Sequence, residues 1–170
     1  MNLHVHGLLA GWSTPWVASS LLVEGMGMSH QWPFWTIHWE IGLLKKLKVL
    51  RVGDNSLTGH ILEEIYKFIE LRVMGFASSL NGSIPRTFGQ LQQLKSLNLQ
   101  DTILSGSIPV ELGNCKSLEI FSAARNGLQG KIPPSLGNLS NLSELLLYSD
   151  DLSEPSLKKM GFWRSWKFLE

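Results

Sequence analysis

The side chains that could do chemistry in this chain are few and do not gather into a catalytic pattern. His4 and His6 could chelate a metal ion only with partners that the sequence does not identify. The adjacent acidic pairs at 63–64 and 150–151 are more typical of a solvated face or a turn than of an acid–base couple. No serine lies in a Gly-x-Ser-x-Gly turn, and the glycines lack the spacing of a nucleotide-binding loop. We therefore predict that the chain is not an enzyme and holds no metal and no cofactor.

The charge balance and the cysteine content exclude further classes of site. The 170 residues include 15 basic and 14 acidic ones, a net charge of +1, so no basic surface for nucleic acid is expected. No run of about 18 apolar residues occurs that could span a membrane. The absence of lysine and arginine before Lys45 argues against a signal peptide. Cys115, the only cysteine, cannot form an internal disulfide and is expected to be a small buried apolar residue.

Any binding residues must be positioned by the elements of an internal repeat. The pattern Leu-x-Gly-x-Ile recurs along the chain at a nearly constant period of about 24 residues. Its leucines are Leu57, Leu80, Leu104 and Leu128, and one more step of the same period leads to Leu152. Upstream of each copy lies a second pattern, Leu-x-x-Leu-x-Leu, which is clearest at Leu94, Leu97 and Leu99. Amphipathic helices are the alternative explanation of such leucines, and the constant position of Gly and Ile argues against it.

The two patterns together predict one strand and one turn per repeat. In Leu-x-Leu both leucines point to the same side of a strand, and one strand cannot bury that side alone. Stacking the next repeat beside it closes a shared core and pairs the strands in parallel. The glycine permits a left-handed backbone, and a proline follows the isoleucine in three units, as in Ile108-Pro109, and fixes φ there. Leu-Gly-Asn at 112–114 and 136–138 is expected to open a short helical or irregular return segment.

Residues 105–115, which read Ser-Gly-Ser-Ile-Pro-Val-Glu-Leu-Gly-Asn-Cys, resemble the ectodomain repeats of plant leucine-rich-repeat receptor-like kinases and receptor-like proteins. The resemblance covers about residues 37–153. It implies an α/β repeat fold, a right-handed solenoid with a parallel β-sheet on its concave face. It also implies a place outside the cell, at the plasma membrane or in the apoplast, and a protein or peptide ligand or a partner receptor. The family's cysteine-paired caps, membrane helix and kinase motifs do not occur in this sequence, so kinase activity is not carried over.

The ends of the chain differ from the repeats in composition. Residues 37–157 hold about five repeats, whereas residues 1–36 hold four of the seven tryptophans without repeat spacing. Residues 158–170 form a basic and aromatic tail. Both ends could cover the open ends of the solenoid core, or they could be sequence foreign to the protein. If the tail is helical, its aromatic residues share one face, which could dock on the last repeat or lie in a membrane interface.

Ligand-contacting residues are expected between the core leucines of each strand, where side chains point to the solvent on the concave face. The candidates are Arg51, Asp54, Asn98, Gln100, Asp101, Ser122, Arg125, Glu144 and Tyr148. Among them, Arg125 and Tyr148 are the strongest anchors, because arginine and tyrosine are enriched at binding hot spots.

Two further predictions concern asparagines. In the family, a repeat asparagine usually bonds the backbone of the turn that follows the strand. The corresponding residues here are Asn55, Ser79, Thr102, Asn126 and Asp150. Separately, three Asn-x-Ser sequons would accept glycans if the chain is secreted. These sequons begin at Asn81, Asn138 and Asn141.

The sequence thus predicts a non-catalytic module that binds a protein or peptide and does not bind nucleic acid. Two alternatives stay open. A secreted leucine-rich-repeat inhibitor of cell-wall-degrading enzymes would use similar repeats, although the lack of cysteine pairs argues against it. A truncated receptor fragment without independent function would explain the missing caps. It would also explain the last repeat, which departs from the motif because Glu154 replaces the glycine.

Overall fold

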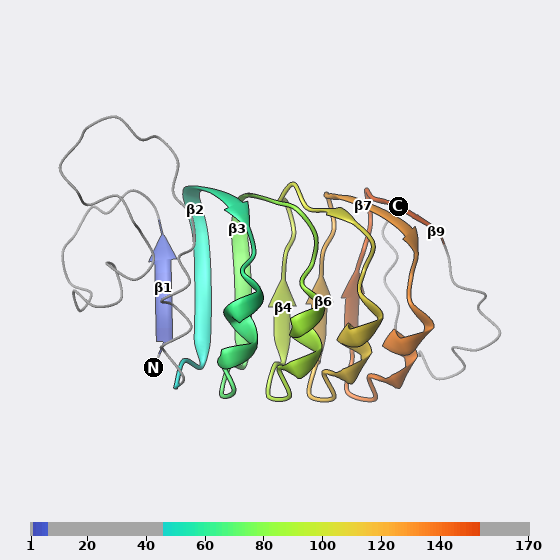
Figure 1. The fold of residues 1–170 in the computed structure, drawn as a ribbon, viewed down its shortest axis with the longest axis horizontal. Coiled ribbons are helices and arrows are strands. Elements are labelled where there is room, and N and C mark those ends of the chain that lie inside the picture. The colour runs from blue at the N-terminus through green and yellow to red at the C-terminus, as the bar shows by residue number, and fades with distance from the viewer. Residues whose placement is uncertain (1, 7–45, 154–170) are drawn as a thin grey trace.

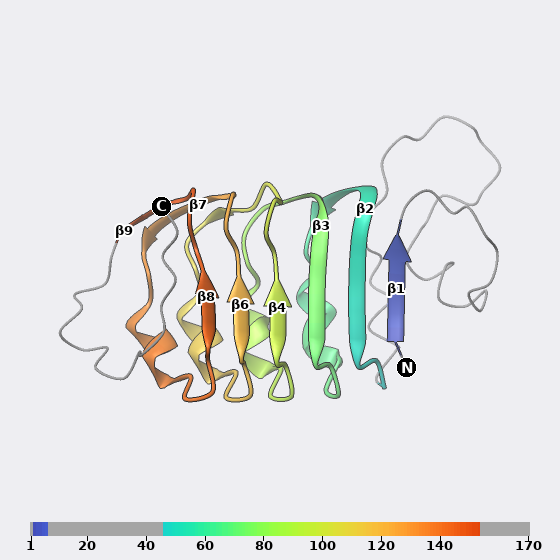
Figure 2. The same cartoon turned by 180° about the vertical axis from the view of Figure 1, so that it is seen from behind.

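The computed structural model of this chain describes residues 2–6 and 46–153, with side chains described outside 2–6, 52–57 and 77–78. Within these residues, the strands of a six-stranded sheet stand side by side in one layer, and short helices lie against the back of that layer (Figure 1). The opposite view shows the strand layer in front of the helices (Figure 2). The described part is therefore a solenoid in which successive repeats add a strand to the sheet and a helical turn to its back.

The strands of the described residues form two parallel sheets. The larger sheet has the order β1-β2-β3-β4-β6-β8, and the smaller one has the order β5-β7-β9. The larger sheet contains β1 (Asn2–His6), β2 (Val49–His60), β3 (Val73–Asn81), β4 (Ser96–Asn98), β6 (Ile120–Ser122) and β8 (Glu144–Leu146). The smaller sheet contains β5 (Ser105–Gly106), β7 (Gly127–Lys131) and β9 (Asp151–Ser153). The helices are 3-10 turns: η2 (Glu63–Lys67), η3 (Arg86–Gln90), η4 (Val110–Asn114) and η5 (Pro134–Asn138).

The core between the two layers uses the same repeat position in every unit. Met74, Leu97, Phe121 and Leu145 are register partners on β3, β4, β6 and β8, and all four are buried. An apolar side chain of this size contributes about 1.5–3 kcal/mol when it is removed from water. One repeat can obtain that contribution only if its neighbours cover it. The leucine-rich parallel solenoid expected from the sequence is therefore confirmed.

Three of the four described helical turns begin directly after a proline of the repeat, whereas η2 follows Leu62. Pro85, Pro109 and Pro133 immediately precede the helices η3, η4 and η5, with φ values of −62°, −69° and −63° that the proline ring imposes. The Leu-Gly-Asn triplets end η4 and η5, whereas the sequence analysis predicts that they open the return segment. A Cβ atom on Gly113 would lie 2.3 Å from the carbonyl oxygen of Ser135. Glycine therefore allows η4 and η5 to pack closely.

One repeat is a residue short, and its strand takes a different course. In the repeats of β4, β6 and β8, the chain turns at a non-glycine residue with a left-handed backbone, as at Arg125. The repeat of β3 has no such residue in the described chain, and β3 continues without a break to Asn81. The register between β2 and β3 shifts between Gly53 and Thr58. β2, whose repeat has the full length, also continues without a break to His60, so β2 and β3 are both longer than β4, β6 and β8.

Strand β1 occupies the amino-terminal edge of the large sheet. It pairs in parallel with β2, and Leu3 lies opposite Leu50 while Val5 lies opposite Val52. The Leu-x-Val sequence of β1 therefore has the same register as the Leu-x-Val sequence of β2. The repeat spacing predicts no strand here, because residues 2–6 lie outside it. The shared Leu-x-Val pattern is the feature of the sequence that could have predicted β1.

Cys115 is part of the core, as predicted. Its side chain is 0% exposed, and its Sγ donates a hydrogen bond to the carbonyl oxygen of Phe88 at 2.8 Å. Burial raises the pKa of the Cys115 thiol to about 11, and a backbone hydrogen bond with Leu91 only partly opposes this. The thiol is therefore protonated near neutral pH.

Candidate ligand-binding face

Most of the predicted contact residues lie on the solvent side of the large sheet or in the turns directly after its strands; we call this surface the sheet face. Five of them are exposed and two are half-buried. The exposed ones are Arg51, Asn98, Asp101, Arg125 and Glu144, and the half-buried ones are Gln100 and Tyr148. The side chain of Asp54 lies outside the described residues. Ser122 departs from the predicted exposure: it is only 4% exposed, because its hydroxyl turns toward Gln100 and not toward the solvent.

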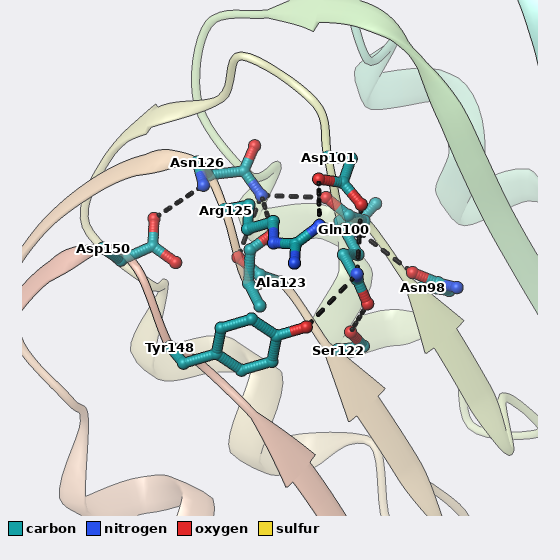
Figure 3. A network of polar contacts seen from close by, with 11 residues as sticks. Asn98, Gln100, Asp101, Ser122, Ala123, Arg125, Asn126, Tyr148 and Asp150 are labelled. Carbon is teal, nitrogen blue, oxygen red and sulfur yellow. Dashed lines mark hydrogen bonds and ion pairs between the residues drawn. The ribbon is translucent and has the colours of Figure 1, made fainter. Parts of the chain in front are cut away.

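Gln100 lies at the centre of a polar cluster that joins three repeats (Figure 3). Its Nε2 atom donates to Oδ2 of Asp101 at 3.0 Å and to the phenol oxygen of Tyr148 at 3.3 Å. Its Oε1 atom accepts from Oγ of Ser122 at 3.3 Å. Its backbone N–H donates to Oδ1 of Asn98 at 3.0 Å. These bonds hold side chains that are far apart in the sequence, such as Gln100 and Tyr148, in one arrangement.

Arg125 completes the cluster on its exposed side. The NH1 atom of its guanidinium lies 3.5 Å from Oδ1 of Asp101, and the group lies 5.7 Å from the centre of the Tyr148 ring. Its side chain is still 58% exposed, so the ion pair is weak and its donors remain accessible to a ligand. Arg125 has a φ of 58°, but Asp101 and Ser149 share this backbone at the same repeat position. The left-handed conformation is thus a property of the repeat and not of this site.

The cluster offers recognition chemistry and no reaction chemistry. It presents guanidinium donors at Arg125, carboxylate acceptors at Asp101 and the phenol of Tyr148, which follow the ends of the neighbouring strands β6, β4 and β8. None of its members is a nucleophile next to a base. Among the described residues, no group of three or more His, Cys, Asp and Glu side chains could hold a metal ion. The described helices are also too short and polar to cross a membrane.

Arg51 and a row of three basic residues lie apart from the cluster. Arg51 and Asn98 are both register partners of Gly75, which has no side chain to bridge them. The basic row consists of three residues that immediately precede β2, β3 and β4, namely Lys48, Arg72 and Lys95. Backbone bonds of 2.8 Å join these residues in sequence. These residues lie just before the strands, outside the strand positions from which contact residues were predicted; their recurrence with the repeat period is the sequence signal that marks them.

Comparison with known proteins agrees with this architecture. The family model described as Leucine Rich Repeat matches residues 93–115 and 117–139. The ectodomain of the receptor kinase SOBIR1 from Arabidopsis thaliana is 31% identical, with a TM-score of 0.66. The match covers 72% of this chain and 68% of that ectodomain. The chain belongs to the leucine-rich-repeat family of plant receptor ectodomains.

Other receptor ectodomains share the same repeats over a smaller part of their length. The ectodomain of GASSHO1/SCHENGEN3 from Arabidopsis thaliana, in complex with CASPARIAN STRIP INTEGRITY FACTOR 2, is 36% identical with a TM-score of 0.65. The match covers 69% of this chain and 14% of that ectodomain. The Arabidopsis receptor kinase HAESA, in complex with the peptide hormone IDA and the co-receptor SERK1, is 31% identical with a TM-score of 0.69. Here 76% of this chain and 22% of HAESA are covered. No curated protein sequence matched the chain.

Behind the cluster, the leucine-rich-repeat asparagine position fixes the strands to each other. The Nδ2 atom of Asn126 donates to the carbonyl oxygens of Leu99 and Ala123, both at 2.9 Å, and to that of Ala124 at 3.2 Å. Its Oδ1 atom accepts from the backbone N–H of Leu104 at 3.1 Å and from the hydroxyl of Thr102 at 2.5 Å. Asn126 therefore satisfies polar groups of two repeats at once and supports the strands that carry the cluster.

Asp150 occupies the same position one repeat later, with a different result. Its Oδ1 atom accepts from the backbone N–H groups of Asn126 at 3.1 Å and of Leu128 at 3.0 Å. Its Oδ2 atom is buried without a hydrogen-bond partner in the described residues. Burial raises the pKa of the Asp150 carboxyl, and the two backbone bonds oppose the shift. The last described repeat is thus tied to its neighbour less completely than the one before it.

The three sequon asparagines differ in exposure. Asn138 and Asn141 are exposed near the end of η5, and Nδ2 of Asn141 donates to the carbonyl oxygen of Lys116 at 2.9 Å. Asn81 is half-buried at the end of β3, and its Oδ1 atom is buried without a partner in the described part. The surface therefore favours Asn138 and Asn141 as glycan acceptors over Asn81.

Proposed function

We propose that this chain binds a protein or peptide on its sheet face, at the cluster of Gln100, Asp101, Arg125 and Tyr148. The observation that carries the proposal is that three consecutive repeats bring these side chains into one hydrogen-bonded group with exposed donors and acceptors. The complexes of HAESA with the peptide hormone IDA and of GASSHO1/SCHENGEN3 with CASPARIAN STRIP INTEGRITY FACTOR 2 support a role of this kind.

The geometry favours recognition because the cluster is already ordered. Tyr148 is half-buried and its hydroxyl is held by Gln100, so little side-chain freedom is lost when a ligand covers it. Arg125 lies against the Tyr148 ring and can still donate to a carboxylate or a peptide carbonyl. Arginine and tyrosine dominate binding energy at many interfaces. We propose a non-catalytic role, because these groups bind and orient a ligand without a reactive atom of their own.

We further propose that the chain acts outside the cell. The support is its similarity to receptor ectodomains and the exposure of Asn138 and Asn141. Expression through a plant secretory pathway would add glycans at these two positions, and an endoglycosidase would remove the added mass. Secreted protein without any such mass would contradict this use of the sequons.

Peptide selection on the purified chain tests the binding proposal. Peptides are selected from a random library on the wild-type chain, and their affinities are then measured for Arg125→Ala and Tyr148→Ala. Lys131→Ala, an exposed residue of β7 outside the sheet face, is the matched control. We expect both cluster variants to weaken binding by at least about tenfold, the effect of losing a hot-spot side chain, and the control to leave it unchanged. Selected peptides that bind both cluster variants as tightly as the wild type would overturn the proposal.

A further inference from the structure

We infer that the amino-terminal half of the sheet face recognises an acidic, extended peptide segment that carries apolar residues between its carboxylates. This inference deepens the proposed function, because it names the chemistry of a ligand that would lie on the same sheet. It rests on residues other than those of the polar cluster, namely on two rows that cross β2, β3 and β4.

The first row is the basic row of Lys48, Arg72 and Lys95, all exposed. These residues hold one repeat position, and the backbone N–H of Arg72 and of Lys95 each donates to the carbonyl oxygen of the preceding member at 2.8 Å. Neighbouring parallel strands lie about 4.8 Å apart, so the row spans about 10 Å, the length of three extended residues. Exposed Arg51 of β2 and Lys46 before it add positive charge at the same end of the sheet.

Ion pairs within the chain neutralise this row only in part. Lys48 lies 4.0 Å from Glu70, and Lys95 lies 2.7 Å from Glu119. Arg72, between them, forms no ion pair with the described residues. Arginine presents five donors in a planar fork that fits a carboxylate, so Arg72 is the member best suited to bind one.

The second row runs beside the first and is apolar where it crosses β2 and β3. The Leu-x-x-Leu spacing leaves two residues outside the core at the start of each strand. The first is basic before β2, β3 and β4, and the second is half-buried on β2, β3, β4 and β6. The half-buried residues are Val49 and Val73, register partners, followed by Ser96 and Ile120. Gly75, in the next row, leaves this part of the sheet uncovered by a side chain. A segment lying here would therefore meet apolar surface and positive charge side by side.

The charge changes sign further along the sheet, which limits where the acidic segment lies. Glu119 takes the position of the basic row before β6, and exposed Glu144 takes the position of the apolar row on β8. A ligand carboxylate over these residues would be repelled. The acidic segment therefore lies over β2, β3 and β4, where charges are complementary. A polysaccharide polyanion would match the basic row but would leave the two valines without a partner.

Binding of synthetic peptides to the full chain tests this inference. The probe is a labelled ten-residue peptide that alternates glutamate and leucine, and the comparison peptides replace leucine by serine or glutamate by lysine. We expect the Glu-Leu peptide to bind tightest and to weaken as salt is raised, because the contacts are exposed. Arg72→Glu should weaken it by at least about tenfold, whereas Lys131→Glu, a change of the same kind on β7, should alter it less than about twofold. Val73→Thr, which keeps the side-chain shape, should bring the Glu-Leu peptide to the affinity of the Glu-Ser peptide.

Three results would overturn the inference. Equal losses for Arg72→Glu and Lys131→Glu would show an effect of net charge alone. Equal affinity of the Glu-Leu and Glu-Ser peptides would indicate a general polyanion surface. Tighter binding of the lysine peptide would contradict the sign of the ligand charge. None of these results would alter the effect of Arg125→Ala on library-selected peptides, so the inference can fail while the proposed function stands.

Discussion

Asn126 and Asp150 hold the same position in successive repeats and differ in one atom that decides how well the repeats are joined. In both, the Oδ1 atom accepts a hydrogen bond from the backbone N–H of the equivalent leucine in the preceding repeat, Leu104 or Leu128. The other terminal atom of the Asn126 side chain is Nδ2, which donates to three carbonyl oxygens. The second atom of Asp150 is an oxygen, buried and without a partner in the described residues.

This repeat position therefore needs a hydrogen-bond donor as much as an acceptor. By the repeat period, the carbonyl groups that correspond to those around Asn126 belong to Ala123, Leu147 and Tyr148. An ionised carboxylate cannot donate to any of them, and a buried polar atom without a partner destabilises a fold by about 1–3 kcal/mol. The middle of the solenoid is therefore fully connected through this position, and its last described repeat is not.

Asn126→Asp should produce the largest loss of stability, because it places a buried carboxylate oxygen without a donor, as at Asp150, between repeats in the middle of the solenoid. The variant keeps the acceptor and removes the donors to Leu99, Ala123 and Ala124. We expect the free energy of unfolding at pH 7 to fall by about 3 kcal/mol, measured by urea denaturation. Asn98→Asp is the matched control, since Asn98 is exposed and uses only its oxygen in the described contacts. An equal fall in the free energy of unfolding of the two variants would show that the lost hydrogen-bond donor of Asn126 does not cause the destabilisation.

Asp150→Asn should have a smaller and opposite effect, because it restores the donor at the end of the stack. We expect a gain of about 1 kcal/mol in the free energy of unfolding at pH 7. Asp151→Asn, an exposed neighbour, should change it little. The gain in the free energy of unfolding from Asp150→Asn should depend on pH, since burial raises the pKa of Asp150 in the folded chain above its unfolded value.

The direction of that pH dependence follows from proton linkage. A carboxyl with a raised folded-state pKa stabilises the fold when it is protonated, so its contribution is complete below the unfolded pKa and is lost as pH rises through the folded pKa. The difference between Asp150→Asn and the wild type should therefore narrow as pH is lowered from 7 toward about 4, near the unfolded pKa of aspartate. A difference that stays constant over this range would mean that Asp150 is not the titrating group.

The repeat period predicted the parts of this comparison that depend on local sequence. It placed Asn126 and Asp150 at one position, put the leucines inside and aligned the strands in parallel, because each of these features recurs with every repeat. It did not show that Oδ2 of Asp150 is buried, since burial depends on how neighbouring repeats close around it.

The sheet face was harder to predict for the same reason. Its candidates were found from alternation along the strand, but the burial of Ser122 depends on a side-chain contact from the preceding repeat, Gln100. Strand β1 depends on a segment distant in sequence that docks at the edge of the sheet, where Asn2 lies opposite Val49. Spacing identifies which positions repeat; it does not identify which side chains fold over one another.

Arg125→Ala should have the smallest effect on stability. It would thereby distinguish a residue of the sheet face, proposed to bind a ligand, from the asparagine position behind it, which stabilises the fold. Its ion pair with Asp101 is exposed, and its contact with the Tyr148 ring is a long one, so we expect the free energy of unfolding to change by less than about 0.5 kcal/mol. Arg125→Gly should be slightly more stable than Arg125→Ala, because glycine relieves the left-handed backbone at a φ of 58°. Thermal and urea unfolding of both variants measure this order. A loss above about 2 kcal/mol in Arg125→Ala would make Arg125 part of the framework, and any effect of that variant on binding would then report folding and not recognition.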